Sequence, residues 1–494
     1  MLPRVARLLY PAVWVEDDFY LESAFLVSMG VRPYLDFVHP HMPLLEWLVA
    51  GYLKLFGASH FTIEILNEGA IYAGNIFTYA LARRAANRRT AILAALLFGF
   101  SALLFRYHVY ERECFVAPLV LLAAIIADRD HAKGPRYAAL IAALFILACA
   151  VKLTAAIAIV VVVAHLATDG RRMRDAIIVG AGAALGVVAL SALLYGLYGF
   201  EFFFQTFLFH FMKGRLDAWA VAAYPLEILD VLVPLFILGA VRLARTRPLA
   251  PAMRLVLAMA LAEYAFYGLL SPTAWGHNYI EALPYIAIIA GVGLDSIVAQ
   301  LGDVVRGERP SRTARSWLAL GVGFIAASLL WFAPLVNENW IRASVYGFGF
   351  LPRAELRTLA ESIRRTSPAG RDVIAPAFLS FEANRAALIR YPETYGVYRE
   401  ARAGYERDGF WAARERLGRA DFFSLVATTS SHWSAPISDA IAAGAVSAVV
   451  GDSPIMTLPL VLVRPDYMMQ NGFGPVSRTE HFTVWGTAAS TSPR

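Results

Sequence analysis

Long apolar runs recur along the first two thirds of this chain and limit what it can fold into. We expect spans at about 61–82, 90–107, 114–127, 137–151, 153–167, 176–199, 226–241, 255–271, 280–300 and 317–336. Such runs, in a chain that is 58% hydrophobic and only 17% charged, are typical of helices that cross a membrane. The sequence therefore predicts a polytopic α-helical membrane protein with about 11 transmembrane helices, counting one partial helix near the start.

The amino-acid composition of the sequence changes after residue 336. Residues 337–494 mix charged and apolar positions with Pro and Gly, which is typical of a soluble domain. Helical patterns at 354–365, 398–417 and 437–445 alternate with strand-like stretches at 372–378, 422–428, 446–450, 458–463 and 481–486. Such alternation predicts a small layer of helices and strands, so we expect an extracytoplasmic α/β domain over 337–494. The preceding part, 1–336, is expected to form the transmembrane bundle, with its first outer loop at 16–60.

Positive charge alternates between the loops that join the spans. Eighteen Lys and Arg residues lie in the loops near 83–89, 129–136, 171–174, 242–254 and 306–315, whereas the intervening loops from residue 106 to residue 279 hold five. Lys and Arg are enriched in cytoplasmic loops. The first set of loops is therefore predicted to be cytoplasmic, and the other loops and the C-terminal domain are predicted to face outward.

The start of the chain fits this orientation poorly. Residues 1–15 would have to cross the membrane, yet they are few and include Arg4 and Arg7. A signal peptide is not favoured, because Glu16 follows instead of a small-residue cleavage site. We expect a first helix that is only partly present.

Acidic residues and histidines gather at the predicted outer ends of the spans. The acids are Glu16, Asp17, Asp18, Glu111 and Glu113, and the histidines are His39, His41, His60, His108, His210 and His277. A polar group at the lipid boundary costs several kcal/mol when it has no partner. Each of these residues alone is common in a solvent-exposed loop. One shared site would explain why the acids and histidines occur together at these helix ends.

Such a site has the groups for transfer chemistry at the membrane surface. A carboxylate can take the proton of an attacking hydroxyl, and Arg, Lys and His can neutralise a phosphate leaving group. A phosphate at this depth most naturally belongs to a lipid-linked substrate. The stretch FEFFFQTFLFHFMKGRLDAW at 200–219, which contains Lys213 and Arg215, predicts an interfacial helix that either lines a prenyl-chain groove or serves only as an anchor.

Two other properties are not favoured by the composition. The net charge of +6 is spread over short loops instead of one stripe, so nucleic-acid binding is not expected. Cys114 and Cys149 both lie in apolar runs and predict two buried thiols, with no disulfide framework.

Four segments resemble one family of membrane enzymes. They are EDDFYLESAFLVSMGVRPYLDFVHPHMPLLEWLVAGYLKLFG, RYHVYERECFVAPLVLLA, ACAVKLTAAIAI and WGHNYIEALPYIAIIAG. These segments resemble motifs of the C-type fold (GT-C) glycosyltransferases, in the branch of the protein O-mannosyltransferases and lipid A aminoarabinose transferases. The resemblance extends to the order of the segments along the chain and to the side of the membrane predicted for each. The residues that match the first motif of that branch are Asp17, Asp18, Tyr20, Gly30, Pro33, Tyr34, Asp36, Phe37, His39, Pro40, His41 and Pro43.

This resemblance implies transfer of a sugar, with inversion, from a polyprenyl-phosphate donor to a hydroxyl of a lipid, glycan or protein. The reaction would take place on the outer face of a bacterial inner membrane. Asp17 would be the general base or the carboxylate that positions the acceptor, with Glu16 and Asp18 as alternatives because the tripeptide fits the motif in two registers. Glu113 would be the second acid, with Glu111 as its alternative.

The resemblance also implies substrate-binding residues. Arg112, Lys152 and His277 are candidates for holding the donor phosphate, and His39 and His41 are candidates for binding the acceptor or a divalent ion. The further candidates are Tyr20, Lys213, Arg215 and Tyr279. No metal ligand is assigned, because two histidines around a proline are thin evidence, and a divalent cation as cofactor is left open.

Two alternatives from other classes stay open. A secondary transporter would place ionisable residues near the membrane midplane and carry two related halves. No clear repeat is visible, and Asp230, Glu263 and Asp295 are the few acids inside the later spans. A non-catalytic component of envelope polysaccharide assembly would not need acids at the outer helix ends.

Overall fold

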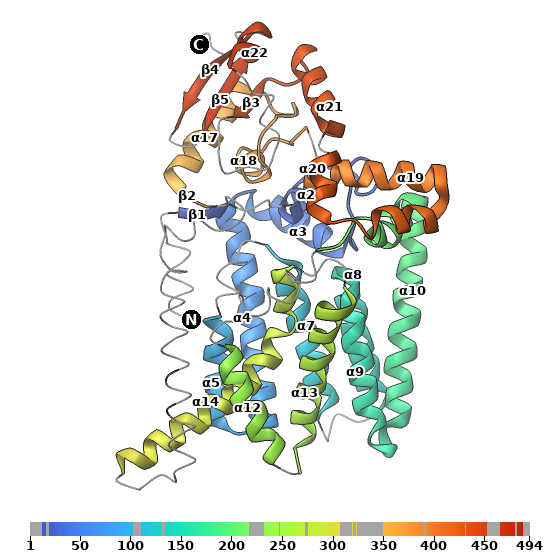
Figure 1. Ribbon diagram of the computed structural model, residues 1–494, viewed down its shortest axis with the longest axis vertical. Helices are drawn as coiled ribbons and strands as arrows, with labels where there is room; N and C mark the ends of the chain where they lie inside the picture. The colour runs from blue at the N-terminus through green and yellow to red at the C-terminus, as the bar shows by residue number, and fades with distance from the viewer. Residues whose placement is uncertain are drawn as a thin grey trace. The chain divides into compact units, whose positions relative to one another are not determined.

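The chain forms two compact units (Figure 1). The first comprises Met1–Ile65, Leu194–Leu216 and Val336–Arg494, and the second comprises Leu66–Leu193 and Asp217–Leu335. The segment predicted to be the first outer loop therefore groups with the C-terminal segment. This computed structural model describes residues 12–15, 19–101, 110–129, 134–216, 232–246, 248–271, 275–306, 319, 323, 349–388, 392–429, 431–451, 465–479 and 482–487.

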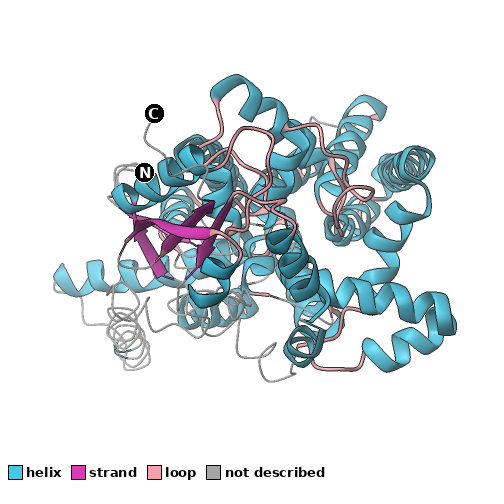
Figure 2. Cartoon of the chain, turned by 90° about the horizontal axis from the view of Figure 1, so that it is seen from above, coloured by secondary structure: helices cyan, strands magenta, loops and turns pink. Residues whose placement is uncertain are grey.

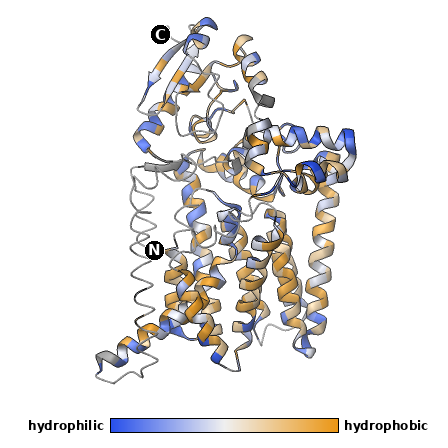
Figure 3. Ribbon diagram, viewed as in Figure 1, coloured by the Kyte–Doolittle hydropathy of each residue, from blue (hydrophilic) through white to orange (hydrophobic). Residues whose placement is uncertain are grey.

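The second unit is a bundle of mostly apolar helices (Figure 3). It contains most of α4 (His60–Ala85) and α10 (Met173–Phe203), and α5 (Arg88–Gly99), α7 (Arg112–Ala127), α8 (Pro135–Val151), η1 (Leu153–Ala155), α9 (Ala156–Ala167), η2 (Gly170–Arg172), α12 (Leu232–Arg245), α13 (Pro251–Ala265), η5 (Phe266–Leu270), η6 (Gly276–Ile280) and α14 (Leu283–Val305). A helix is found at every predicted span between residues 61 and 300. The predicted span 317–336 lies outside the described residues apart from two positions.

Three helical stretches of the described chain are long and apolar enough to cross a membrane: Gly170–Phe211, Pro251–Leu270 and Leu283–Asp303. Pro135–Val151 and Leu153–Ala167 are apolar but shorter, as the sequence predicts. The protein is an integral membrane protein. The total of about 11 spans stays a prediction.

Glycines bring two of these helices into backbone contact. A Cβ atom on Gly239 of α12 would collide with the carbonyl group of Ile289 on α14, and one on Gly293 would collide with the carbonyl of Leu235. Small residues at helix contacts allow this close approach in a membrane bundle. The same pair of helices therefore depends on glycine at both positions.

The helix α7 joins two polar regions of the second unit. Near its C-terminal end, Arg84 Nε donates to Asp128 Oδ2 at 2.8 Å, and Arg172 donates to the carbonyl oxygen of Ala127. Both arginines belong to loops predicted to be cytoplasmic. Glu113 lies in the first turn of α7, which has 16 residues. A helix of that length spans about 24 Å, so Glu113 lies at the other end of the helix from these arginines.

The first unit combines helices with two small sheets, whose strands are magenta in Figure 2. Its helical segments are α2 (Phe19–Ser28), α3 (Leu44–Phe56), η3 (Phe204–Leu208), η4 (Phe209–Phe211), α17 (Arg353–Thr366), α18 (Ala377–Glu382), α19 (Pro392–Leu417), α20 (Phe422–Thr429), α21 (Ser431–Ala442) and α22 (Pro465–Gln470). β1 (Ala12–Val15) pairs antiparallel with β2 (Gly349–Pro352). β3 (Ala448–Gly451), β5 (Thr483–Thr487) and β4 (Phe473–Arg478) form an antiparallel sheet in that order. Buried side chains of α17, α18, β3 and β5 form one apolar core.

The predicted strand at 422–428 is wrong, because this stretch forms helix α20. The side chain of Asp421 accepts a hydrogen bond from Ser424 N at 2.8 Å and so satisfies a free amide of the first turn. This cap outweighs the strand preference of the Phe and Val residues.

The predicted strand at 372–378 is also wrong for most of its length. Val373 and Ile374 form only isolated bridges, and α18 begins directly after Pro376, which has no amide to donate to a strand. The strands predicted near 446–450 and 481–486 are confirmed as β3 and β5, but the sheet is antiparallel and includes β4, which was not predicted. The predicted strand 458–463 lies outside the described residues.

A kink separates the α10 span from the Phe-rich stretch that follows. Gly199 adopts φ +63°, a conformation that favours glycine, inside α10. Beyond it, the buried side chains of Phe204 and Phe209 pack against α19. The predicted boundary between the span that ends at residue 199 and the next helix coincides with this kink. The interfacial position of the helix predicted at 200–219 stays a prediction.

Candidate active site

The N-terminal turn of α7 buries two charged residues. The side chains of Arg112 and Glu113 are both 0% exposed. A carboxylate near a helix N-terminus is stabilised by the free amides there. Arg112 Nη1 donates to the backbone carbonyl oxygen of Val151 at 3.0 Å, which ties this turn to the end of α8.

Lys152 lies at the break between α8 and η1. Its backbone is extended, with φ −154° and ψ 122°, although its amide still donates to Ala148 O at 2.9 Å. Its Nζ atom forms an ion pair with Glu113 Oε1 and a second with Glu281 Oε1 at 3.0 Å. One buried ammonium therefore joins two buried carboxylates that come from different parts of the chain.

A tyrosine from a π-helical turn completes this cluster. Tyr267 belongs to η5, which directly continues α13, and the wider turn of a π-helix is often found at functional sites. Its hydroxyl donates to Glu281 Oε1 at 3.0 Å and lies 3.3 Å from Lys152 Nζ. Thr154 Oγ1 donates to the same carboxylate oxygen at 3.2 Å.

The short helix η6 supplies an amide to the cluster. Asn278 Nδ2 donates to Glu113 Oε1 at 2.8 Å, and the side-chain oxygen of Asn278 accepts from the amide of Trp275 at 2.9 Å. The second hydrogen bond fixes which end of the Asn278 amide faces Glu113. Glu113 is thus held by an ammonium and by an amide donor.

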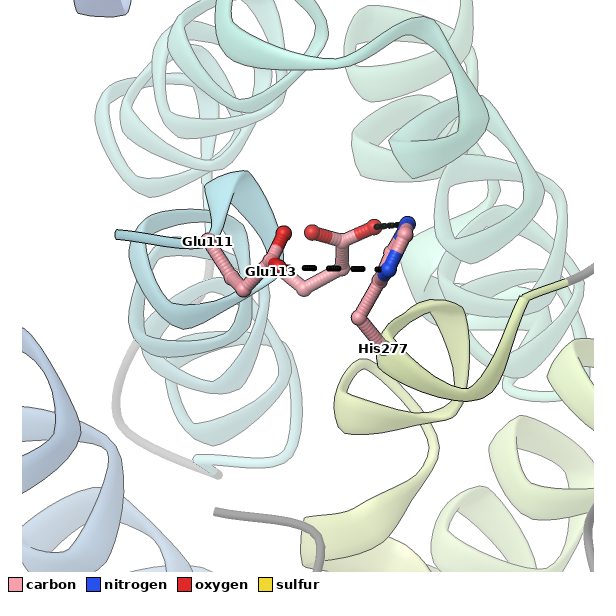
Figure 4. A group of neighbouring side chains, drawn as sticks. All are labelled: Glu111, Glu113 and His277. Carbon is pink, nitrogen blue, oxygen red and sulfur yellow. Dashed lines mark ion pairs between the residues drawn. The ribbon is translucent and has the colours of Figure 1, made fainter. Parts of the chain in front are cut away.

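His277 points toward two acids of the α7 N-terminus (Figure 4). Its Nδ1 lies 3.9 Å from Glu111 Oε1, and its Nε2 lies 3.9 Å from Glu113 Oε1. These three residues each offer one ligand atom, and the atoms lie within 4.8 Å of one another. Two carboxylates and one imidazole suit a divalent cation such as Zn²⁺ or Mn²⁺, so the donor set fits the cation that the sequence left open.

Carboxylates outnumber cations in the cluster. Glu113, Glu281 and Glu263 are all at most 4% exposed, and Lys152 is the ammonium that pairs with the first two. The Oε2 atom of each of these three acids has no hydrogen-bond partner among the described residues. Such oxygens can accept a hydrogen bond or a proton from a hydroxyl group.

Several predicted site residues therefore meet in the second unit: Glu111, Arg112, Glu113, Lys152, His277 and Tyr279 lie on adjacent segments. Tyr279 is buried, and its ring centroid lies 5.8 Å from that of Tyr267. Lys152 was predicted to hold a phosphate, but its charge is shared by two carboxylates. Glu16, Asp17 and Asp18 lie outside the described residues.

Three other predicted residues meet in the first unit. His39 Nε2 lies 3.4 Å from Glu46 Oε2, and its amide donates to Gln205 Oε1 at 2.7 Å. The ring of His41 lies 5.3 Å from that of Tyr20 and 5.5 Å from that of His210, measured between centroids. The buried hydrogen bond to Gln205 therefore attaches His39 to the π-helix η3.

Lys213 and Arg215 follow η4 in the first unit. The amide of Arg215 donates to Ala420 O at 2.9 Å, and the amide of Phe422 donates to Arg215 O at 2.8 Å. The Arg215 side chain is exposed, and Lys213 is half-buried. These backbone bonds attach this segment to the start of α20.

The sequence did not single out Glu281, Tyr267, Asn278 or Thr154 as site residues. Glu281 and Asn278 stand inside the quoted WGHNYIEALPY segment, where an acid four residues after His277 was an available signal. Tyr267 gave no signal, because its position depends on the extra residue of a π-helical turn.

Comparisons with known proteins place the chain among membrane glycosyltransferase folds. Residues 38–195 match the model of the dolichyl-phosphate-mannose-protein mannosyltransferase family. The crystal structure of ArnT from Cupriavidus metallidurans bound to undecaprenyl phosphate matches with a TM-score of 0.63 and 14% identity, over 100% of this chain and 99% of that chain. The same protein in the apo state gives 0.62 and 14%, over 100% and 97% of the two chains.

A more distant match is AglB, the archaeal oligosaccharyltransferase from Archaeoglobus fulgidus. It has a TM-score of 0.48 and 12% identity, over 98% of this chain and 71% of that chain. No curated protein sequence matches the chain. The resemblance predicted from the four sequence segments is confirmed: the chain has the fold of the GT-C glycosyltransferase ArnT, and part of it matches the mannosyltransferase family model.

Proposed function

We propose that this protein is an integral-membrane glycosyltransferase that takes a sugar from a polyprenyl-phosphate-linked donor and attaches it to a hydroxyl group on the outer face of the membrane. The observation that carries the proposal is the buried Glu113–Lys152 pair. Both residues lie within the segment that matches the mannosyltransferase model, in a chain that shares its fold with a protein crystallised with undecaprenyl phosphate.

The reaction proposed is a single displacement with inversion. The acceptor oxygen attacks the anomeric carbon, the bond from that carbon to the phosphate oxygen breaks, and polyprenyl phosphate leaves with the electron pair. The acceptor proton passes to a carboxylate, which we assign to Asp17, with Glu16 or Asp18 as the alternative. General-base catalysis of this kind contributes about 10²- to 10⁴-fold in rate.

Glu113 is proposed to orient the acceptor or the base. Its Oε1 atom is occupied by Lys152 and Asn278, and its buried Oε2 atom has no partner among the described residues. That oxygen is available to accept a hydrogen bond from a substrate hydroxyl. Glu111, Glu113 and His277 would hold a divalent cation, which would neutralise charge that develops on the leaving phosphate.

Arg112 and His277 are proposed to bind the donor phosphate. Lys152, the third candidate from the sequence, shares its charge between two carboxylates. His39, His41, Tyr20 and Tyr279 are proposed to bind acceptor or sugar, and Lys213 and Arg215 are proposed to bind lipid headgroups. The acceptor is a lipid, a glycan or a protein.

A transporter remains the alternative function, and one observation weighs against it. A transporter would gather its ionisable residues near the membrane midplane. Glu113 is in the first turn of α7, and Lys152 directly follows the last turn of α8. Charged residues at helix ends, not at helix centres, favour a reaction at the membrane surface. We propose that this membrane is the cell membrane of a bacterium.

The test compares the glycans and lipids of a strain that lacks the gene with those of the parent strain by mass spectrometry. A sugar should vanish from one acceptor, and the wild-type gene should restore it. The variant Glu113→Gln should be inserted into the membrane at normal levels but fail to restore the sugar. The control Glu361→Gln makes the same change at an exposed position of α17 and should restore it fully.

Two results would contradict the proposal. One is an unchanged set of glycans and lipids in the deletion strain together with loss of uptake or export of a solute, which would indicate a transporter. The other is full restoration by Glu113→Gln, which would remove this cluster from the reaction.

A further inference from the structure

We infer that Glu281 is a positioning residue of the proposed reaction, which holds the Lys152 ammonium against Glu113 and so fixes the Glu113 carboxylate. The inference rests on the proposed function. Glu281 lies outside residues 38–195, which match the mannosyltransferase model. The fold of the chain brings its carboxylate next to Lys152.

The first support is that Lys152 has contacts on two sides. Its Nζ atom pairs with Glu113 Oε1 and, at 3.0 Å, with Glu281 Oε1. A lysine side chain has four rotatable bonds, so one ionic contact does not fix the position of its ammonium group. The second contact is therefore what restricts Lys152, and through it Glu113.

The second support is that Glu281 is itself held tightly. Its Oε1 atom accepts hydrogen bonds from Tyr267 OH at 3.0 Å and from Thr154 Oγ1 at 3.2 Å, in addition to its ion pair with Lys152. The side chains of Tyr267 and Glu281 are 1% and 4% exposed. A buried carboxylate oxygen with three donors has a fixed orientation, as a residue that positions another group requires.

The third support is the balance of charge. Lys152 is neutralised by two carboxylates, and its ammonium group is 3.3 Å from Tyr267 OH on a third side. Its remaining capacity to bind a phosphate is small. Lys152 and Glu281 therefore act on the reaction through Glu113, and neither is expected to contribute to the affinity for the lipid phosphate.

The experiment separates product formation from lipid binding. Variants are expressed in the strain that lacks the gene, and the restored glycan is measured by mass spectrometry at equal protein levels. The same variants are purified in detergent, and binding of undecaprenyl phosphate is measured by native mass spectrometry. Glu281→Gln should lower the product by about 10²-fold, as expected for a misplaced reacting group, while its affinity for undecaprenyl phosphate stays within about twofold of wild type.

Two further variants keep the test decisive if Glu281→Gln folds poorly. Tyr267→Phe removes one donor from Glu281 and keeps the ring, so it should lower the product several-fold. In a Glu281→Gln background, it should cause no further loss, because both changes act through the same carboxylate. Glu281→Asp keeps the charge and should restore part of the product lost in Glu281→Gln.

Asp295→Asn is the matched control. Asp295 is a buried acid of α14, at 6% exposed, and its ion pair is with Arg89 instead of Lys152. It should retain most of the product. A loss as large as that of Glu281→Gln would show that any change to a buried acid is harmful, and it would overturn the positioning role.

The possible failures are distinguishable. Full activity of Glu281→Gln, with Glu113→Gln inactive, overturns the role of Glu281 and leaves the proposed function intact. Full activity of Glu113→Gln overturns the proposed function itself. A parallel loss of product and of undecaprenyl phosphate affinity in Glu281→Gln shows a binding role, and it also overturns the inference.

Discussion

Lys152 Nζ and Glu281 Oε1 lie 3.0 Å apart in a part of the molecule where both side chains are almost fully buried. Lys152 follows the last residue of α8, and Glu281 precedes α14. Because the same ammonium also pairs with Glu113 at the start of α7, one positive charge joins three segments of the bundle. A buried ion pair of this kind contributes more to the arrangement of groups than to net stability, as long as it stays intact.

Breaking the pair is expected to be costly. Lys152→Met leaves Glu113 and Glu281 buried side by side without their cation, and the loss of one partner of a buried pair typically costs about 3–5 kcal/mol. We expect a lower melting temperature for the purified protein in detergent and a lower yield from membranes. Lys54→Met, the same change at an exposed position of α3, should leave both unchanged. An unaltered melting temperature in Lys152→Met would contradict the buried ion pair.

The predicted orientation can be tested with single cysteines. Leu35, in the predicted first outer loop, is 44% exposed, and Arg171, in an arginine-rich loop predicted to be cytoplasmic, is also exposed. The native Cys114 and Cys149 are 2% and 0% exposed and should give little background. In intact cells, a membrane-impermeant maleimide should label Leu35→Cys but not Arg171→Cys, and Arg171→Cys should react only after the membrane is opened. The reverse pattern would place the proposed reaction in the wrong compartment.

Part of the site could be predicted from the sequence because charge is rare in these helices. Glu113, Lys152 and His277 interrupt or flank apolar runs, where a polar residue is conspicuous, and the structure brings all three together. Glu281 and Tyr267 lack that contrast. The side chain of Tyr267 faces the site because of a π-helical turn, and the apolar periodicity of the sequence does not encode the extra residue.

The C-terminal region was harder to predict than the bundle. A long apolar run defines a membrane helix by composition alone, whereas short apolar segments suit strands and helices equally. The segment that follows Asp421 is an example, since a single side-chain cap decides for helix α20. The helices predicted at 354–365 and 398–417 are found as α17 and α19, although α19 has a kink at Gly409, where φ is +77°.

The contact between α12 and α14 predicts a strong requirement for glycine. Gly239→Ala places a methyl group against the carbonyl of Ile289, which is backbone and cannot rotate away. Overpacking of this kind costs about 1–3 kcal/mol, so we expect a clear fall in melting temperature. Gly51→Ala, in α3, meets no heavy atom within 4 Å and should have little effect or raise stability slightly. Equal melting temperatures for the two variants would contradict the close contact of the two helices.

The stability of the first unit should depend on pH through Glu382. Its Oε2 atom accepts a hydrogen bond from the amide of His60 at 3.0 Å and lies 2.9 Å from His60 Nδ1. Burial raises the pKa of Glu382, but the hydrogen bonds and positive charge of His60 lower it more, so the pKa lies below its ordinary value. A carboxylate with a lowered pKa in the folded state stabilises the fold above its unfolded pKa of about 4.3, and this contribution is lost as the pH falls through the folded pKa.

Glu382→Gln is therefore expected to be less stable than wild type at pH 6, by about 1–3 kcal/mol for a lost charged hydrogen bond. The difference should shrink as the pH falls from about 4.3 through the lower pKa of the folded state, since wild-type Glu382 becomes protonated over that interval. Melting temperatures measured from about pH 2 to pH 7 test this, with Glu361→Gln at an exposed position of α17 as the control. Wild-type and Glu382→Gln curves that stay parallel over this range would show that the His60 contact does not depend on the charge of Glu382.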